Sequence, residues 1–426
     1  MTQYERAREG AITPEMERTA EAERRSAEEV RAAIAAGRAV IPFNKNRQTD
    51  AVCIVGEGFR TKVNANIGSS MDHASIDTEL EKLRAAEEAG ADTVMDLSTG
   101  GDIDAIRRRI IAEARVSLGS VPIYDAAIKA ARKHHNIMRM TAEDMLAAVR
   151  MHCEDGIDFV TVHCGVTKDV VRSLGQTDRV CGVVSRGGTF LSEWVKHHGQ
   201  ENPLYERYDE VLDIAREHDA TLSLGDGLRP GAIADAFDRP QVHELNVLAE
   251  LAERARRAGV QVMIEGPGHV PLNQIQSQVQ MEKELCKGAP FYVLGPLVTD
   301  VAPGYDHINA AIGGAVAGMA GADFLCYVTP TEHLSLPTRD DVREGVVVAR
   351  LAAHAADVAK GVPGAAEWDR EFSGYRKARD WQRMIDSCLD PQKAQELRDH
   401  IKAKSEDTCS MCGDYCVFKV REKAGK

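Results

Sequence analysis

A short apolar run passes directly into a glycine-rich polar turn in the stretch Thr221-Leu222-Ser223-Leu224-Gly225-Asp226-Gly227-Leu228-Arg229-Pro230-Gly231. From about Phe59 to Val328 the chain repeats this combination at intervals of roughly thirty to forty residues, with amphipathic stretches in between. Such a rhythm is typical of βα units with parallel strands. No early G-x-G-x-x-G turn opens a dinucleotide-binding half-sheet. We therefore predict an α/β fold, a (β/α)8 barrel rather than an open doubly wound sheet.

More segments qualify as barrel strands than an eight-stranded barrel can use, so one of them is expected to lie outside it. Capping residues support the alternation with helices, because Ser75 precedes Leu80 and Leu83 at helical spacing, Gly90 closes that helix, and Thr141 opens another. The candidate strands are Thr61–Asn66, Thr93–Leu97, Val121–Tyr124, Phe159–His163, Val180–Ser185, Thr221–Gly225, Gln261–Glu265, Phe291–Leu294 and Phe324–Val328.

The barrel is expected to occupy residues 59–360. An N-terminal segment (1–58) precedes it, and its part before Ile41 is rich in Glu, Arg and Ala, which predicts charged helices outside the barrel. C-terminal helices (361–403) and a cysteine-bearing tail (404–426) follow it.

The charge balance limits the classes of partner. The chain has 53 basic and 66 acidic residues and a formal net charge of −13, which argues against binding to nucleic acid or to an anionic membrane surface. No leader peptide is recognisable in Thr2–Arg6, and no uncharged apolar run is long enough to span a bilayer. We expect a soluble protein of the cytoplasm.

Polar and glycine-rich clusters fall where several of the predicted strands end, which is the catalytic face of a (β/α)8 barrel. Any single cluster fits an ordinary βα turn, but clusters in register are harder to explain that way. Two of these clusters, around Ser185–Gly188 and Asp226–Arg229, offer backbone N–H groups, a hydroxyl and guanidinium groups. Such donors suit a phosphorylated sugar. The clusters are Asn64–Gly68, Met95–Gly101, His163–Gly165, Ser185–Gly188, Gly225–Gly231 and Glu265–His269.

Three titratable residues in these clusters are candidate catalytic groups. Asp226 and Glu265 are suited to hold ribose hydroxyls or to take protons. His163 is suited to polarise a ring or to transfer a proton. The alternative for each is a polar group at a strand end that is satisfied by its neighbours.

Two histidines on late βα loops form a candidate metal site. His269 and His333 are far apart in sequence but are expected on the same face of the barrel. Two neutral imidazoles there would make an open site that water or substrate completes. A capping or core role is the alternative for each, and His307 is the competing ligand.

The tail carries the motif C-x2-C-x3-C in Cys409, Cys412 and Cys416. A [4Fe–4S] cluster held by three thiolates keeps one iron open, and that iron can chelate S-adenosylmethionine for reductive cleavage to a 5′-deoxyadenosyl radical. A redox-labile thiol tail or a zinc knuckle completed by His400 is the alternative. The other seven cysteines are scattered singly and are interpreted as buried core thiols.

The polar and glycine-rich clusters and the cysteine motif together resemble the phosphomethylpyrimidine synthase family over nearly the whole chain. The resemblance implies a radical S-adenosylmethionine enzyme, a carbon–carbon lyase with a (β/α)8 barrel and a C-terminal cluster tail. It also implies 5-aminoimidazole ribotide as substrate, an external electron donor, and a homodimer in which the tail reaches the partner's active site. The runs are Val63–Gly68, Met95–Gly100, Val184–Gly188, Gly225–Gly231, Glu265–Pro271 and Cys409–Gly413.

The resemblance also implies a role for individual residues. Zinc or another divalent metal falls to His269 and His333, and the cluster to Cys409, Cys412 and Cys416, although longer members of the family space the last two cysteines by four residues and this chain by three. Substrate contacts fall to Asn66, Met95, Tyr124, His163, Ser185, Arg186, Gly187, Asp226, Gly227, Leu228, Arg229, Glu265 and Tyr292.

Two departures from the family pattern bear on the product. Phe43 and Arg47 stand where the thiamin-pathway enzymes have Ala and His, and Arg376–Asp380 replaces a Ser-Lys-Ala-Arg-Phe run. Groups around a radical steer its fate, and we expect Phe43 and Arg47 to line or brace the pocket. We therefore predict the anaerobic paralogue, which makes 5-hydroxybenzimidazole for the lower ligand of a cobamide in cobalamin biosynthesis. The alternative is a phosphomethylpyrimidine synthase that makes 4-amino-5-hydroxymethyl-2-methylpyrimidine phosphate for thiamin. A non-catalytic metal-binding or electron-transfer protein is the second alternative.

Overall fold

The computed structural model describes residues 1–47, 49, 52–401, 403 and 408–424. The chain divides into two compact units, Met1–Ala359 and Lys360–Lys426. The finer boundaries after residues 58 and 403 stay predictions. Among the described residues, no helix is both long and apolar enough to cross a membrane.

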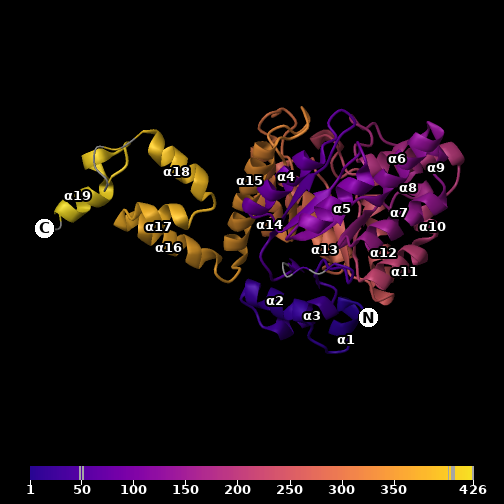
Figure 1. The fold of residues 1–426 in the computed structure, drawn as a ribbon, viewed down its shortest axis with the longest axis horizontal. Coiled ribbons are helices and arrows are strands. Elements are labelled where there is room, and N and C mark those ends of the chain that lie inside the picture. Colours follow the sequence, from indigo (N-terminus) through magenta and orange to yellow (C-terminus); the bar gives the residue numbers. More distant parts are fainter. Residues whose placement is uncertain (48, 50–51, 402, 404–407, 425–426) are drawn as a thin grey trace. The chain divides into compact units, whose positions relative to one another are not determined.

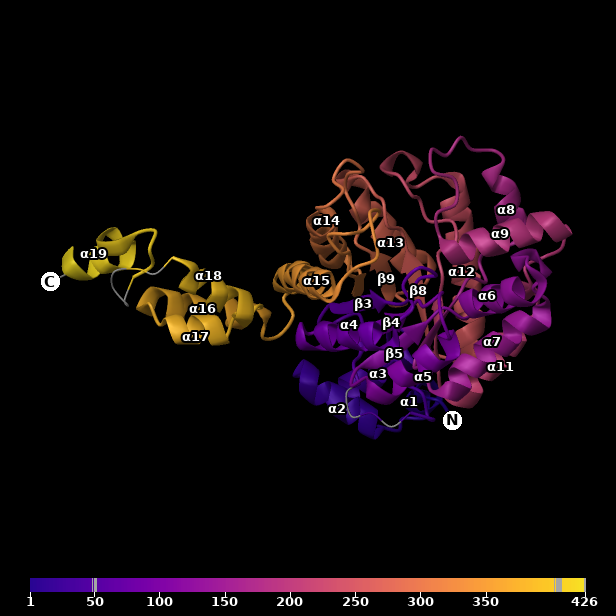
Figure 2. The same cartoon turned by 45° about the horizontal axis from the view of Figure 1, so that its top comes forward.

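Eight parallel strands form a closed barrel in the first unit, which confirms the predicted fold class. Neighbouring strands follow the chain order, and β10 closes the ring by pairing with both β9 and β3. Figure 2 shows the strands at the centre with the helices around them. The strands are β3 (Lys62–Ile67), β4 (Thr93–Asp96), β5 (Ser117–Ser120), β6 (Phe159–Val162), β7 (Thr221–Leu224), β8 (Val262–Gly266), β9 (Phe291–Leu294) and β10 (Phe324–Cys326).

Helices cover the outside of the barrel, and the capping residues begin them where expected. The Ser75 hydroxyl accepts the N–H of Thr78 at the start of α4, and Thr141 forms a capping box with Asp144 at the start of α7. The helices are α4 (Ile76–Glu88), α5 (Ile103–Glu113), α6 (Pro122–His134), α7 (Ala142–Asp155), α8 (Lys168–Leu174), α9 (Arg186–His198), α10 (Pro203–Glu206), α11 (Tyr208–His218), α12 (Arg239–Arg257), α13 (Ile275–Leu285), α14 (Asp306–Ala320) and α15 (Arg339–Lys360).

Two of the nine strand predictions were wrong. Val121–Tyr124 belongs to the start of α6, where Pro122 takes the first helical position, and the strand lies just before it. Val180–Ser185 is the surplus candidate and forms no strand. Val180 is 74% exposed, so its β-branched side chain packs in no sheet. The backbone N–H groups of Val180 and Cys181 donate instead to the carboxylate of Asp235.

The N-terminal segment forms helices with a core of their own, as its composition predicted. They are α1 (Gln3–Arg8), α2 (Pro14–Glu23) and α3 (Ala27–Ala35), followed by the paired short strands β1 (Ala39–Val40) and β2 (Val55–Gly56). Buried Met16, Val30, Ile34, Ile41 and Ile54 join them. Figure 1 shows these helices together beside the barrel.

The residues that suggested a changed product lie away from the catalytic face. The Arg47 guanidinium forms an ion pair with Asp158, immediately before β6, and donates to the Ala114 carbonyl at 2.7 Å, a few residues before β5. These are the N-terminal ends of the strands, whereas active sites of such barrels lie at the C-terminal ends. Phe43 packs on the core of the N-terminal helices. The expectation that Phe43 and Arg47 line the pocket was therefore wrong.

The second unit consists of short helices. They are α16 (Ala365–Ala378), α17 (Trp381–Asp386), α18 (Pro391–His400) and α19 (Val417–Ala424). The Trp368 indole donates to the Ser387 carbonyl at 2.8 Å, and Arg379 pairs with Glu422 at 2.9 Å, which ties α19 to the end of α16. The run Arg376–Asp380, which differs from the family pattern, lies in this unit.

Candidate active site

A cavity of about 690 Å³ opens at the C-terminal ends of the barrel strands. It brings together residues that are far apart in sequence, from strands β3, β4, β6, β8, β9 and β10 and from the loops that follow the strands. Tyr124 reaches it from the first turn of α6 rather than from a strand. The predicted site residues that line the cavity are Asn66, Met95, Tyr124, His163, Arg186, Asp226, Arg229, Glu265, Tyr292 and His333.

The other predicted substrate contacts lie directly behind the cavity wall. The Ser185 hydroxyl caps α9 by accepting the N–H of Gly188 at 3.1 Å, and it lies 3.2 Å from Nε2 of His163. A Cβ atom on Gly188 would stand 2.0 Å from the carbonyl oxygen of Gly227. The loop after β7 therefore presses against the start of α9. Leu228 is fully buried in that loop.

The His163 ring is enclosed by two glycines. A Cβ on Gly187 would lie 2.3 Å from Cε1 of this ring, and one on Gly225 would lie 2.8 Å from Cδ2. Burial, and then the Arg229 charge, lower the pKa of His163 to about 3. The imidazole is therefore neutral at physiological pH and carries one N–H donor and one acceptor nitrogen. Close packing explains why glycines recur in these motifs.

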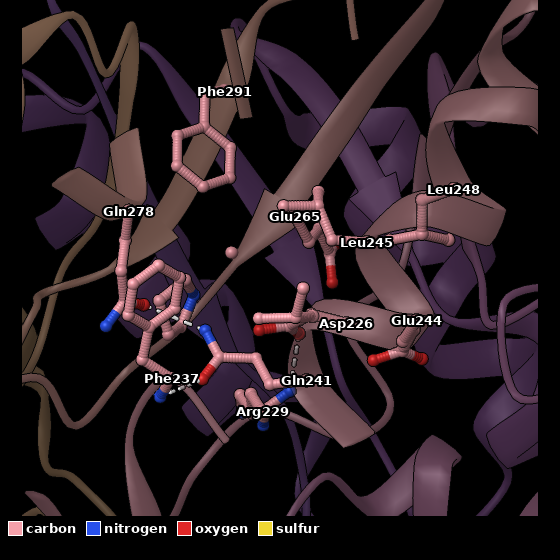
Figure 3. A pocket seen from close by; sticks show the side chains of 13 residues that line it. Asp226, Arg229, Phe237, Gln241, Glu244, Leu245, Leu248, Glu265, Gln278 and Phe291 are labelled. Atoms are coloured by element: carbon pink, nitrogen blue, oxygen red, sulfur yellow. Dashed lines mark hydrogen bonds and ion pairs between the residues drawn. The ribbon is translucent and has the colours of Figure 1, made fainter. Parts of the chain in front are cut away.

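An arginine and two carboxyl groups form the electrostatic centre of the cavity. Nη1 of Arg229 pairs with Oδ1 of Asp226 at 3.0 Å, and Figure 3 shows this pair beside Glu265. Burial raises the pKa of Asp226 to about 7, Arg229 lowers it, and the Glu265 charge raises it. Burial also raises the pKa of Glu265, whose Oε1 accepts from the hydroxyls of Thr161 at 2.7 Å and Ser223 at 2.9 Å. Asp226 is thus poised to hold or release a proton near neutral pH.

A buried hydrogen-bond network, which the sequence did not reveal, orients the opposite wall. Nδ2 of Asn64 donates to Oδ1 of Asn66 and to the Tyr292 hydroxyl, both at 2.8 Å. Nδ2 of Asn66 lies 3.1 Å from Sγ of Cys326, and the Tyr327 hydroxyl donates to the Asn66 carbonyl at 2.6 Å. Cys326 was interpreted as a core thiol; it is buried, but it lines the cavity.

The two candidate metal-binding histidines lie close together, with ring centroids 5.4 Å apart. Nδ1 of His269 is 2.8 Å from Oδ1 of Asp300, and Nδ1 of His333 is 3.0 Å from Oδ2 of Asp306. A carboxylate on one ring nitrogen leaves the other free to ligate, which is the usual support for a metal-binding histidine. His307 instead borders a separate small cavity of about 10 Å³.

Asp300 and Asp306 were not singled out in the sequence, and neither was Glu332, which lines the main cavity. Burial raises the pKa of Glu332, and the nearby His333 lowers it. Each of these acids is one of many in the chain. Asp300 and Asp306 are distinguished only by their pairing with histidines in space, and Glu332 only by its place in the cavity wall.

The three tail cysteines occupy the loop before α19. The backbone N–H of Cys412 donates to the Cys409 sulfur and lowers the pKa of that thiol. The pKa of Cys412 is raised, by desolvation and then by the Cys409 charge. Within the described ranges no set of three His, Cys, Asp or Glu side chains is arranged to hold a metal ion. The thiols are neighbours, but they do not form a finished ligand set.

The remaining cysteines are less uniform than expected. Cys153, Cys164 and Cys286 are buried, whereas Cys181 is exposed and Cys53 and Cys388 are partly exposed. The interpretation of all seven as buried thiols was therefore wrong for these last three.

Curated relatives match the whole length of the chain. The phosphomethylpyrimidine synthase of Moorella thermoacetica is 58% identical over 427 residues, covering 100% of this chain and 99% of that protein. The enzyme of the same name from Desulforamulus reducens is 56% identical, covering 99% and 97%. A solved dihydropteroate synthase from Thermus thermophilus is 14% identical, with a TM-score of 0.42 over 75% of this chain and 99% of that one.

The names of these relatives contradict the preferred functional prediction. Relatives that are 53–58% identical over 99–100% of this chain are named phosphomethylpyrimidine synthase, the enzyme of the alternative prediction. The prediction of 5-hydroxybenzimidazole synthesis was therefore wrong. The positions of Phe43 and Arg47, at the N-terminal ends of the strands, supply the physical reason.

The sequence model of the Radical SAM ThiC family matches residues 2–423. A radical S-adenosylmethionine family implies a [4Fe–4S] cluster and S-adenosylmethionine as cosubstrate, so the protein is an enzyme and not a passive metal-binding or electron-transfer module. The chain belongs to the Radical SAM ThiC family.

Proposed function

We propose that this enzyme is a phosphomethylpyrimidine synthase, which converts 5-aminoimidazole ribotide to 4-amino-5-hydroxymethyl-2-methylpyrimidine phosphate for thiamin biosynthesis. One observation carries the proposal. A cavity that gathers Arg186, Arg229, Asp226 and Glu265 occurs in a chain 58% identical to an enzyme of that name. The cavity volume of about 690 Å³ is in the range of small-molecule sites.

The ribotide phosphate is proposed to bind at the start of α9. The first N–H groups of a helix have no partner within it, so those of Arg186 and Gly187 suit an anion. The Arg186 guanidinium lies 5.0 Å above the Tyr124 ring, which restricts where it can point. Arg229 supplies a second cation in the same cavity.

The ribose and imidazole are proposed to lie between the two walls of the cavity. Asp226 and Glu265 accept from ribose hydroxyls, and Asp226 moves a proton at its carboxyl oxygen, since its pKa is about 7. Neutral His163 and the amide of Asn66 hydrogen-bond to the imidazole and its amino group. Met95 and Tyr292 supply apolar contact area.

The cluster is proposed to be held by Cys409, Cys412 and Cys416. Three thiolates and no fourth ligand in the motif fit a [4Fe–4S] centre with one open iron. When bound, the cluster supplies the electron that cleaves S-adenosylmethionine, and an external donor replaces that electron. The lowered pKa of Cys409 favours the thiolate that ligation needs.

A homodimer is proposed because one helix carries an unpartnered apolar face. Tyr305 immediately precedes α14, and Ile308, Ile312 and Met319 follow it at helical spacing, each between 47% and 65% exposed. A second copy of the chain is the proposed cover for this face. The cysteine tail belongs to the other compact unit and is proposed to serve the partner's cavity.

A divalent metal, zinc or another, is proposed to bind His269 and His333. Their carboxylate partners Asp300 and Asp306 set both ring orientations, and their rings are within reach of a single ion. Two protein ligands leave positions for water or substrate on the metal.

Replacing His269 with asparagine should remove the divalent metal from cluster-loaded protein, because one imidazole cannot hold it tightly alone. Zinc content by mass spectrometry is the measurement, made on protein whose tail thiolates already hold the cluster. The His307→Asn variant is the control and should keep its zinc, since His307 borders a different cavity. Full zinc content in both His269→Asn and His333→Asn would contradict the proposed metal site.

Anaerobic turnover tests the proposed reaction itself. Reconstituted enzyme given 5-aminoimidazole ribotide, S-adenosylmethionine and a reductant should form the pyrimidine phosphate, identified by mass spectrometry. A Phe43→Ala variant should form the same product, because Phe43 packs on the N-terminal helices. The proposal fails if either protein yields a benzimidazole, or if no ribotide is consumed while S-adenosylmethionine is cleaved.

A further inference from the structure

Glu244 lies behind the active-site cavity, on the side of α12 that faces the loop after β7. Its side chain is 2% exposed, and its Oε2 accepts the backbone N–H of Leu228 at 2.7 Å. In sequence Leu228 lies between Asp226 and Arg229, the carboxyl and the guanidinium that form an ion pair at the cavity's electrostatic centre. A buried hydrogen bond therefore connects α12 to the backbone of the segment 226–229.

The opposite side of this loop is fixed by close packing. The Gly227 carbonyl lies against Gly188 so tightly that a Cβ there would be 2.0 Å from the oxygen. A Cβ on Gly227 would meet Val166 at 2.3 Å and Oε1 of Glu244 at 3.1 Å. The loop is thus held between the start of α9 on one side and Glu244 on the other. Movement of the loop would change the spacing between Arg229 and the first turn of α9.

The packing around Glu244 is not complete. A cavity of about 30 Å³ lies beside it, lined also by Asp226, Arg229, Gln241 and Gln278. Figure 3 shows these side chains around it. Within the described part of the chain, Oδ2 of Asp226 and Oε1 of Glu244 are buried without a hydrogen-bond partner. The packing on this side thus leaves a small space beside the loop, and the Glu244 bond to Leu228 is a specific restraint on the loop backbone there.

Burial raises the pKa of Glu244 to about 8, the Leu228 N–H lowers it, and the Asp226 charge raises it. At neutral pH the carboxyl is mostly protonated, so one oxygen accepts from Leu228 while the other carries the proton. A glutamine has the same shape and the same acceptor. This makes the acceptor, rather than the charge, the property of Glu244 that the loop requires.

We propose that Glu244 is a positioning residue for substrate binding, which holds the segment 226–229 through the Leu228 N–H so that Asp226 and Arg229 meet the ribotide. The inference rests on the proposed function for the identity of the ligand. The restraint of the loop by Glu244 does not depend on the proposed function. The two parts can therefore be measured separately.

The test compares Glu244→Leu, which loses the acceptor, with Glu244→Gln, which keeps it. Glu244→Leu should weaken 5-aminoimidazole ribotide binding by about tenfold or more and raise its KM similarly, while the KM for S-adenosylmethionine stays within about twofold. Glu244→Gln should stay within about threefold of wild type, because an amide oxygen replaces the carboxyl oxygen. Calorimetry on full-length, cluster-loaded protein measures the ribotide affinity.

The matched control is Glu282→Leu on α13. Glu282 is also a fully buried carboxyl whose pKa is raised to about 8, but it lines neither the active-site cavity nor the small cavity beside Glu244. The same substitution there should leave the ribotide affinity within about threefold of wild type. A loss of affinity in Glu282→Leu equal to that in Glu244→Leu would indicate a general loss of stability and overturn the inference.

Hydrogen exchange tests the restraint without any ligand. The peptide covering 226–231 should exchange faster by about tenfold in Glu244→Leu and at the wild-type rate in Glu244→Gln. If Glu244→Leu does not fold, Glu244→Asp serves instead, because a side chain shorter by one methylene cannot reach Leu228. Unchanged exchange in Glu244→Leu, or in Glu244→Asp where it replaces the leucine variant, overturns the inference. Ribotide that fails to bind wild type refutes the proposed function, and the exchange result then still decides the role of Glu244.

Discussion

Replacing Cys412 with alanine should abolish cleavage of S-adenosylmethionine, with at least about a thousandfold loss, because two thiolates cannot hold a site-differentiated [4Fe–4S] cluster. Cys412 is the middle ligand of the motif and is exposed in the loop before α19. Its side chain makes no contribution to the barrel core, so the barrel unit should remain folded. Iron and sulfide content, the cluster absorbance and the yield of 5′-deoxyadenosine are the measurements.

The control for Cys412→Ala is the same substitution at Cys388. This cysteine lies in the same unit, outside the motif, and its sulfur donates to the Ile385 carbonyl at 3.2 Å. Cys388→Ala should keep its cluster and its activity within about twofold, as expected for a partly exposed site. Normal 5′-deoxyadenosine formation by Cys412→Ala would contradict the assignment of the cluster ligands. Equal losses in both variants would point to a general effect on the second unit.

Regular parts of the fold could be predicted because they depend on local patterns. Ser75 and Thr141 begin helices through bonds to the next turn, and the alternation of apolar runs with such caps specifies a barrel. The errors arose where composition alone was used. Val180–Ser185 is as apolar as a strand, but its exposure is set by the rest of the molecule. Pro122 marks a helix start more strongly than Val121 and Tyr124 mark a strand.

Parts of the site were predictable for a different reason. Strand ends meet on one face of any parallel barrel, so Asn66, Asp226 and Glu265 were expected to converge without knowledge of side-chain positions. The partners that tune them were not predictable. Asp300 and Asp306 come from loops with no periodic pattern, and they acquire their role by lying next to His269 and His333.

The wrong choice of product shows the limit of interpreting substitutions one at a time. Phe43 and Arg47 precede the first barrel strand, which begins at Lys62, and nothing in the sequence says at which end of the strands they lie. The structure answers this through Asp158, which pairs with Arg47 at the start of β6. Arg47 compensates the charge of the buried Asp158 carboxylate at this end and cannot contact a radical at the other end of the barrel. Altered residues direct a reaction only where they touch it.

Replacing Arg229 with glutamine should weaken ribotide binding by about a hundredfold or more, since charge-assisted bonds to the ligand and to a buried acid are lost together. Arg229 pairs with Asp226 at 3.0 Å and also lowers the pKa of Glu265. Without this cation the two carboxyls would be buried near each other and would lack the ion pair that compensates them. Calorimetry of ribotide binding is the measurement. The exposed Arg239→Gln, at the start of α12, is the control and should bind normally.

The pH dependence separates the two causes of that loss. In wild type, Asp226 ionises as the pH rises through about 7, the cavity becomes more negative, and affinity for the anionic ribotide should fall above that pH. In Arg229→Gln the pKa of Asp226 is expected to rise further, because its neutralising partner is gone. The fall in affinity should therefore begin at a higher pH in the variant than in wild type. Binding by Arg229→Gln within about threefold of wild type at every pH would show that Arg229 neither holds the ligand nor balances the acids.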